Sequence, residues 1–314
     1  MARCLQLARH GELTTAPNPM VGAVIVHDGR IIGEGWHRCY GGPHAEVNAV
    51  ASVRPEDERL LEEATIYVSL EPCSHWGKTP PCAELLVKKG FSRVVVGCLD
   101  PNEKVAGRGI KRLQEAGIEV VVGILEDECQ WLNRKFMIFH RLHRPYITLK
   151  WAESADGFID RSRESHADGP AVHFSTPWTQ MLVHHLRATH EAILVGRRTW
   201  ELDRPSLTTR EWPGRSPKRL ILTSRANPQV REWSPWSPEG TEKPLLVYAL
   251  PGEWGESPQS LLVEGGAQTL QSFIDADLWD EAFIERSEIV LSDGVRAPKL
   301  KRDLKGRPVH VNFA

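Results

Sequence analysis

Short apolar segments alternate with helical segments along the chain, and this alternation limits the possible folds more than any other feature. In the first half, strands are expected at 20–26, 31–36, 65–70, 92–98 and 118–122, and helices near 44–53, 82–89, 109–116 and 126–142. The Asp-Gly pair between the first two strands predicts a hairpin turn. Helices that alternate with buried strands indicate an α/β layer fold.

The alternation is interrupted at Arg144-Pro145 and resumes with a strand at 146–150. Strands are then expected at 191–196, 219–223, 244–248, 260–263 and 282–290, helices at 176–188 and 267–275, and loops at 200–218 and 231–243. A chain of 314 residues has room for two domains, since a domain takes roughly 100–200 residues. The sequence therefore predicts one domain over 1–143 and another over 144–314.

Charge and cysteine usage narrow the class of protein. The formal net charge of −2 gives no broad basic field for nucleic acid. No apolar run approaches the roughly 20 residues of a membrane span, and the N-terminus lacks the apolar core of a signal peptide. The six cysteines are unevenly placed, which is untypical of a disulfide framework. We expect a cytoplasmic protein with neither a nucleic-acid nor a membrane partner.

Four residues at predicted strand–helix junctions form a candidate zinc site. His44 opens one helix, Cys73 follows a strand and Cys82 begins the next helix. One His and two Cys are a typical ligand set for catalytic zinc, which keeps its fourth position for water and lowers the pKa of that water toward about 7. Glu46 stands two residues after His44, where a carboxylate could move protons without binding the metal. H-x-E followed by P-C-x-x-C is the sequence signature of zinc deaminases. This chain has the H-x-E and the P-C, but eight residues instead of two separate its cysteines.

A closed structural zinc site is the alternative interpretation of the same residues. A fourth cysteine would complete such a site, and the chain also contains Cys4, Cys39, Cys98 and Cys129. Cys98 and Cys129 stand in apolar segments that suit packing. His37 and His75 are further possible ligands.

Four segments together resemble one known family. They are EPCSHWGKTPPC at 71–82, HAEVNA at 44–49, PNP at 17–19 and DPN at 100–102. They resemble the bifunctional riboflavin biosynthesis deaminase/reductases, in which eight residues between the cysteines are usual. The resemblance implies a cytidine-deaminase-like three-layer domain followed by a dihydrofolate-reductase-like domain. It also implies hydrolytic deamination of 2,5-diamino-6-ribosylamino-4(3H)-pyrimidinone 5′-phosphate, then reduction of its ribosyl group to ribityl with NADPH.

The resemblance also implies roles for individual residues. Deaminase substrate contacts are expected from Asn18, His75 and Lys78. Reductase substrate contacts are expected from Lys150, Leu207, Arg210 and Glu264, and cofactor contacts from Thr199, Asp203, Gly265 and Gly266. Two glycines between a strand and a helix let a phosphate approach the backbone, although a plain strand–helix turn has the same pattern. The family usually carries a Trp where this chain has His173.

Three other functions are compatible with parts of the sequence. The second domain could have lost reduction and serve in dimerisation, since the family expectation is a homodimer. The first could act on tRNA adenosine, which would require a basic channel lined by aromatic side chains. The chain could also be a zinc-stabilised binding protein without catalysis.

Overall fold

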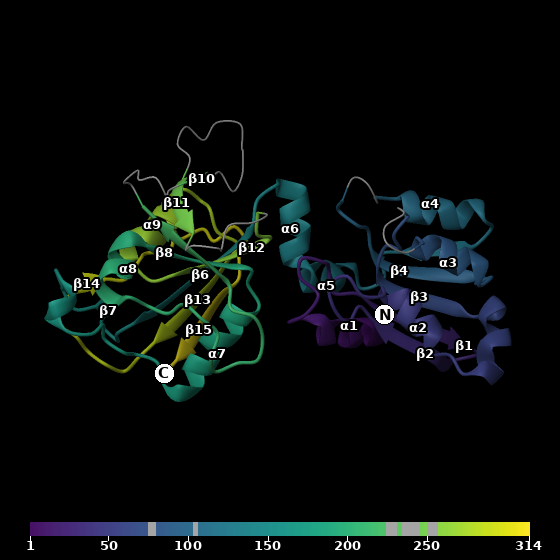
Figure 1. Ribbon diagram of the computed structural model, residues 1–314, viewed down its shortest axis with the longest axis horizontal. Coiled ribbons are helices and arrows are strands. Elements are labelled where there is room, and N and C mark those ends of the chain that lie inside the picture. Colours follow the sequence, from purple (N-terminus) through teal and green to yellow (C-terminus); the bar gives the residue numbers. More distant parts are fainter. Residues whose placement is uncertain (75–79, 103–105, 224–230, 234–244, 250–256) are drawn as a thin grey trace. The chain divides into compact units, whose positions relative to one another are not determined.

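The computed structural model of the protein describes residues 1–74, 80–102, 106–223, 231–233, 245–249 and 257–314. The chain divides into two compact units, Met1–Leu142 and His143–Ala314 (Figure 1). Among the described residues, no helix combines the length and the apolarity that crossing a bilayer requires.

The first unit is built on a five-stranded sheet with the order β2-β1-β3-β4-β5. Its strands are β1 (Gly22–His27), β2 (Arg30–Trp36), β3 (Thr65–Leu70), β4 (Arg93–Cys98) and β5 (Glu119–Val122). β1 runs antiparallel to β2 and β3, which confirms the hairpin, whereas β3, β4 and β5 are parallel. The carboxyl ends of β3 and β4 therefore lie at one edge of the sheet.

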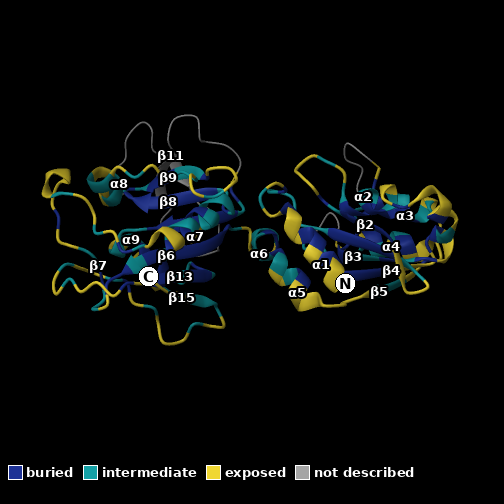
Figure 2. Ribbon diagram, turned by 90° about the horizontal axis from the view of Figure 1, so that it is seen from below, coloured by how far each residue is buried: buried dark blue, intermediate teal, exposed yellow. Residues whose placement is uncertain are grey.

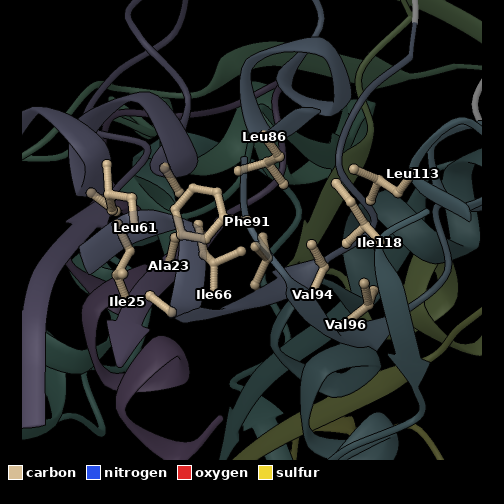
Figure 3. Packing of buried hydrophobic residues seen from close by; sticks show 14 of the residues in the cluster. Ala23, Ile25, Leu61, Ile66, Leu86, Phe91, Val94, Val96, Leu113 and Ile118 are labelled. Atoms are coloured by element: carbon tan, nitrogen blue, oxygen red, sulfur yellow. The ribbon is translucent and has the colours of Figure 1, made fainter. Parts of the chain in front are cut away.

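Helices cover both faces of this sheet, because alternate strand residues are apolar on both sides. Helices α2 (Ala45–Ala51), α3 (Cys82–Lys88) and α4 (Arg108–Glu115) pack over the face that carries Ile66 and Val94 (Figure 3). On the other face, α1 (Ala2–Ala8) packs against Val24, and α5 (Glu126–Leu132) comes so close to Gly97 that a Cβ there would lie 2.4 Å from Cys129 Sγ. The expected three-layer domain is confirmed.

The predicted single helix over 126–142 is wrong, because it is interrupted at Asn133. Two helices, α5 and α6 (Arg134–Leu142), take its place. Asn133 is 3% exposed, and its amide accepts from the Met20 backbone N–H at 2.8 Å and donates to the Met20 carbonyl at 2.9 Å. This long-range pair satisfies both groups of the buried amide, and it anchors the segment that follows Pro17-Asn18-Pro19.

The second unit contains an eight-stranded sheet with the order β10-β11-β9-β8-β12-β6-β13-β15. Its strands are β6 (Tyr146–Glu153), β8 (Ala192–Gly196), β9 (Lys218–Leu222), β10 (Arg231–Trp233), β11 (Leu245–Ala249), β12 (Ser260–Glu264), β13 (Glu281–Arg286) and β15 (Val309–Phe313). Neighbours from β9 to β15 in this order are parallel. A separate ribbon pairs β7 (Phe158–Asp160) with β14 (Val295–Arg296). The described residues also form 3-10 helices at Arg9–Gly11, Pro55–Glu63 and His166–Asp168.

The two faces of this sheet differ in polarity. Helix α9 (Ala267–Asp275) packs Leu270 and Phe273 onto an apolar face that includes Leu149 and Val263. The opposite face carries Lys150 and Glu264, and helix α7 (Pro177–Ala188) contributes Arg187, which pairs with Glu264. Both sheets are largely buried, as Figure 2 shows.

Two sequence expectations for this unit need correction, and one strand has no counterpart among them. The loop predicted from residue 200 begins inside a helix, α8 (Arg197–Asp203). The strand predicted over 282–290 ends at Arg286, where Ser287 Oγ accepts the Ile289 backbone N–H and turns the chain. The C-terminal segment, which has no predicted element, forms β15, which adds to the edge of β13 and satisfies its backbone groups.

Candidate functional site

His44, Cys73 and Cys82 come together in the first unit. Their ligand atoms all lie within 4.8 Å of one another. His44 Nδ1 lies 3.5 Å from Cys73 Sγ and 3.3 Å from Cys82 Sγ, so Nδ1 is the nitrogen directed at both sulfurs. His44 is the N-cap of α2, Cys73 follows β3 and Cys82 is the first residue of α3. This nitrogen-and-thiolate donor set fits zinc.

The pKa values of the two sulfurs shift in opposite directions. The hydrogen bond from Cys82 is the largest of the effects that lower the pKa of Cys73 to about 4, and His44 adds to it. The same hydrogen bond raises the pKa of Cys82 well above its ordinary value, and burial adds to it. The bond to Cys73 also raises the pKa of His44 to about 8. Negative charge is thus already favoured where a cation would bind.

Glu46 lies in the first turn of α2 and is 3% exposed. Burial raises the pKa of its carboxyl to about 7, and the charge of Cys73 adds to this shift. Glu46 is outside the three-residue ligand cluster. A buried carboxyl beside a metal site, but not a ligand in it, can accept and return a proton.

Asn18 reaches the cluster through His37. Its Nδ2 lies 3.1 Å from His37 Nε2, while His37 Nδ1 lies 3.0 Å from the Pro43 carbonyl. Because a carbonyl only accepts, Nδ1 carries the proton, and Nε2 accepts from the Asn18 amide. The His37 ring also meets the His44 ring edge-on at 5.5 Å between centroids. His37 therefore orients neighbouring groups. The sequence alternative in which His37 is a metal ligand is not supported.

The remaining alternatives concern cysteines and the loop between the ligands. Cys4, Cys98 and Cys129 are buried, Cys39 is exposed, and none joins the ligand cluster within the described residues. His75 and Lys78 lie outside the described residues.

Glu71 precedes the ligand Cys73 by two residues and has no role predicted from the sequence. It is 4% exposed and accepts backbone N–H groups from Gly107 and Gly109, each at 3.0 Å. A Cβ at Gly109 would lie 2.0 Å from the Pro72 carbonyl, so the backbone there closely approaches the segment that carries the ligand Cys73. The Glu71 carboxylate thus ties the start of α4 to this segment. In the sequence, the only signal for Glu71 is its place in the Glu-Pro-Cys motif.

In the second unit, the glycine turn lies where β12 ends and α9 begins. Gly265 and Gly266 have φ of 71° and 72°, a region that favours glycine. A Cβ at Gly266 would lie 2.9 Å from Thr199 Oγ1, so the turn adjoins the start of α8. The predicted cofactor residues Thr199, Gly265 and Gly266 are thus brought together at the carboxyl ends of β8 and β12, an edge where ligands of open α/β sheets commonly bind.

Asp203, the fourth predicted cofactor residue, is already paired. Its Oδ1 accepts from Arg163 Nη2 at 2.6 Å, and Asp160 holds the same guanidinium. Arg163 is 7% exposed and also donates to the Gly169 carbonyl at 3.2 Å. The structure therefore assigns Asp203 a structural contact that fastens segment 160–169 to α8.

The predicted substrate residues Lys150 and Glu264 face each other across neighbouring strands. Glu264 is opposite Lys150 in the parallel register. Arg187 of α7 donates to both Glu264 oxygens, at 3.1 and 2.7 Å, and to the Thr208 carbonyl at 3.2 Å. Burial is the largest single effect and raises the pKa of Glu264. The charge and hydrogen bonds of Arg187, together with the charges of Lys150 and His184, outweigh it, so the pKa lies below its ordinary value. Arg187 was not identified from the sequence, because its partners are distant along the chain.

Leu207 and Arg210 lie on the segment that Arg187 holds. The Leu207 side chain is 2% exposed and packs against Ile193 and Ile221, so only its backbone could meet a ligand. Arg210 is exposed, its Nη1 contacts Thr208 Oγ1 at 3.0 Å, and its backbone N–H donates to His184 Nδ1 at 2.9 Å. His173 is exposed.

Two family models match the chain. A model of the cytidine and deoxycytidylate deaminase zinc-binding region matches residues 1–98, and a model of the RibD C-terminal domain matches residues 145–249. The riboflavin biosynthesis protein RibD of Bacillus amyloliquefaciens is 37% identical, over 96% of this chain and 86% of the relative. RibD of Escherichia coli strain K12 is 47% identical, over 67% of this chain and 55% of the relative.

Solved structures agree over the whole chain. A diaminohydroxyphosphoribosylaminopyrimidine deaminase/5-amino-6-(5-phosphoribosylamino)uracil reductase from Thermotoga maritima superposes with a TM-score of 0.78 at 33% identity, over 98% of this chain and 91% of that chain. RibD of Acinetobacter baumannii superposes with a TM-score of 0.77 at 30% identity, with the same coverage.

Proposed function

The chain belongs to the RibD family of bifunctional riboflavin biosynthesis deaminase/reductases, and from this premise we propose which residues perform each reaction. The observation that carries the proposal is the cluster of His44, Cys73 and Cys82 with buried Glu46 beside it. The proposed substrate is 2,5-diamino-6-ribosylamino-4(3H)-pyrimidinone 5′-phosphate. Water replaces its ring amine and releases ammonia, and the ribosyl group is then reduced to ribityl.

In the first reaction, His44, Cys73 and Cys82 would hold zinc through one nitrogen and two sulfurs. When bound, zinc supplies a water of lowered pKa that is nucleophilic at neutral pH. Glu46 takes a proton from the attacking water and delivers a proton to the leaving amine; the carbon–oxygen bond forms at the ring carbon first, and the carbon–nitrogen bond then breaks to release ammonia. Its burial keeps this carboxyl from exchanging protons with bulk water.

Asn18, His75 and Lys78 are proposed contacts of the deaminase substrate. For Asn18 the support is its bond to His37. Because that bond uses an N–H of the Asn18 amide, its Oδ1 is the group presented as an acceptor, suited to an N–H of the pyrimidine. His75 and Lys78 are proposed on the resemblance of segment 71–82 alone.

In the second reaction, the glycine turn with Thr199 would receive phosphate of NADPH, which supplies hydride when bound. Gly265 and Gly266 let that phosphate approach the backbone at the start of α9. Lys150 and Glu264 would contact the ribosyl group, with Arg210 at its phosphate and the Leu207 backbone beside it. Asp203 would act indirectly, by keeping α8 and segment 160–169 together.

A preference for NADPH over NADH and assembly as a homodimer stay predictions from the family resemblance. So do the cytoplasmic location and the absence of nucleic-acid and membrane partners.

The test follows ammonia release and NADPH absorbance together, with zinc-loaded protein and the diaminopyrimidinone ribosyl phosphate. We expect ammonia first and NADPH consumption second. Ammonia alone would contradict the reductase half and favour a second unit used only for dimerisation. If zinc-loaded protein released no ammonia and consumed no NADPH, the whole proposal would be contradicted.

A further inference from the structure

Glu285 of β13 contains an atom with an unusual environment. Among the described residues, its Oε1 is the only buried side-chain nitrogen or oxygen without a hydrogen-bond partner. The residue is 4% exposed, and its other oxygen accepts from Ser175 Oγ at 2.7 Å. A buried acceptor that lacks a donor destabilises the protein, and such atoms are rare in folded proteins. A hydrogen-bond donor supplied by a ligand would explain why this one is tolerated.

Lys150 is the second incompletely satisfied group, and it lies beside the first. Within the described part of the chain, its ammonium has no hydrogen bond, and Glu285 Oε2 lies 3.9 Å away. That separation is too long for a hydrogen bond. The Lys150 side chain is 15% exposed, so most of it has left water without gaining a direct partner.

The sheet register places these groups on one surface. Strand β6 lies between β12 and β13. Its Lys150 is opposite Glu264 of β12, and its Ala152 is opposite Glu285 of β13. Residues two apart on a strand share a face, so Lys150, Ala152 and Glu285 face the same side. Glu264 forms a close ion pair with Arg187 at 2.7 Å, whereas Glu285 has only the loose ion pair with Lys150 at 3.9 Å.

We infer that Glu285 is a sugar-binding residue of the reductase, and that with Lys150 it brackets one hydroxyl of the ribosyl group. The inference rests on the reduction proposed for this unit. A hydroxyl accepts from the ammonium and donates to the carboxylate through one oxygen. Two bonds of about 2.8 Å from that oxygen readily span the gap between the groups. A phosphate does not suit this position, because it would meet the carboxylate as a like charge.

The first test combines Glu285→Gln with substrates that lack one hydroxyl. Wild-type enzyme should show a KM about tenfold higher for either the 2′-deoxy or the 3′-deoxy ribosyl substrate, because the analogue leaves Lys150 and Glu285 without their shared partner. In Glu285→Gln the KM for the full substrate should rise about tenfold, and the discrimination against that analogue should disappear. Ammonia release and the KM for NADPH should stay unchanged. A rise in the KM for NADPH instead would assign Glu285 to the cofactor and overturn the inference.

Glu281→Gln is the matched control. Glu281 is buried on the same strand, and its oxygens are bound by Tyr146 Oη at 3.2 Å and His310 Nε2 at 3.0 Å. This variant should lower the melting temperature and leave the discrimination intact. Glu285→Gln should not lower it, because the carboxylate it removes has an unpaired oxygen. A melting temperature that falls in Glu285→Gln with unchanged discrimination would show a purely structural role.

Two further measurements keep the outcome decisive. Glu285→Leu repeats the test if the glutamine variant does not fold. Calorimetric binding of D-ribitol 5-phosphate to wild-type protein and to each variant tests the site without turnover. Weaker binding by the Glu285 variants would support the sugar site. If the wild type bound ribitol phosphate but consumed no NADPH, only the proposed reduction would be contradicted. Equal binding by all proteins would overturn the inference.

Discussion

The two units arrange their candidate chemistry in different ways. In the first, three ligand atoms from two helix starts and one strand end lie within 4.8 Å of one another. In the second, the candidate residues are spread over strands and helices, and both candidate carboxylates are paired with arginines. Glu264 binds Arg187, and Asp203 binds Arg163.

This difference reflects what each ligand demands. A zinc ion accepts few residue types at nearly fixed distances, so its ligands leave a recognisable pattern in the sequence. A sugar phosphate or a dinucleotide needs donors and acceptors that many residue types can supply. Such a site is defined by which side chains the sheet and its helices bring together, and its sequence pattern is correspondingly weak.

Removal of a metal ligand should separate the two units most completely. Cys82→Ser removes one of two sulfurs, so zinc content and ammonia release should both fall to background, because a three-ligand site cannot spare one. NADPH oxidation with the deaminated substrate should continue. Metal analysis and the two assays measure this, with exposed Cys39→Ser as the control that keeps its zinc. Full zinc content in Cys82→Ser would show that the ligands are wrongly assigned.

Glu46→Gln should keep the metal and lose the proton transfer. The kcat for deamination should fall by about 100-fold to 10,000-fold, the usual contribution of a positioned acid–base group. Zinc content and the reductase rate should match those of wild type. A deaminase rate within a few-fold of wild type would refute the proton-transfer role of Glu46.

The second unit should be most sensitive to its buried ion pair. Arg187→Met leaves Glu264 as an unpaired buried carboxylate, so the free energy of unfolding should fall by about 3 kcal/mol. The matched control is Arg93→Met in the first unit, whose pair with Glu119 is 44% and 62% exposed. Its change should stay below about 1 kcal/mol. Equal losses in urea denaturation would mean that burial does not distinguish these pairs.

The smallest expected effect is the pH dependence of the same pair. The pKa of Glu264 is lowered in the fold by Arg187 against the opposing effect of burial. The pair's stabilisation is therefore fully present above the unfolded pKa, about 4.3, and is lost as the pH falls through the lower folded value. In Arg187→Met, burial without its main opposing charge raises the pKa of Glu264, so the stability difference between wild type and this variant should shrink as the pH falls through the interval between the two folded pKa values. Urea denaturation at several pH values measures this; a difference that grows in acid would contradict the assigned direction.

Local pattern predicted most of the secondary structure because local forces decide it. The strand over residues 65–70 and the helix over 267–275 have the predicted bounds, since each combines a regular apolar period with turn residues at its ends. The helix predicted over 126–142 was broken by Asn133, whose partner Met20 is distant in sequence. The last strand, β15, pairs with β13, which is distant from it along the chain.

The sequence by itself determined the α/β class, the candidate zinc ligands and the resemblance to one family, because residue type and spacing carry these directly. Only the tertiary structure revealed that His37 holds Asn18, that Arg187 neutralises Glu264 and that Glu285 and Lys150 lie together incompletely bonded. Each of these contacts joins elements far apart along the chain. Their energies depend on burial and on distances between side chains, which become defined when the sheets and helices pack.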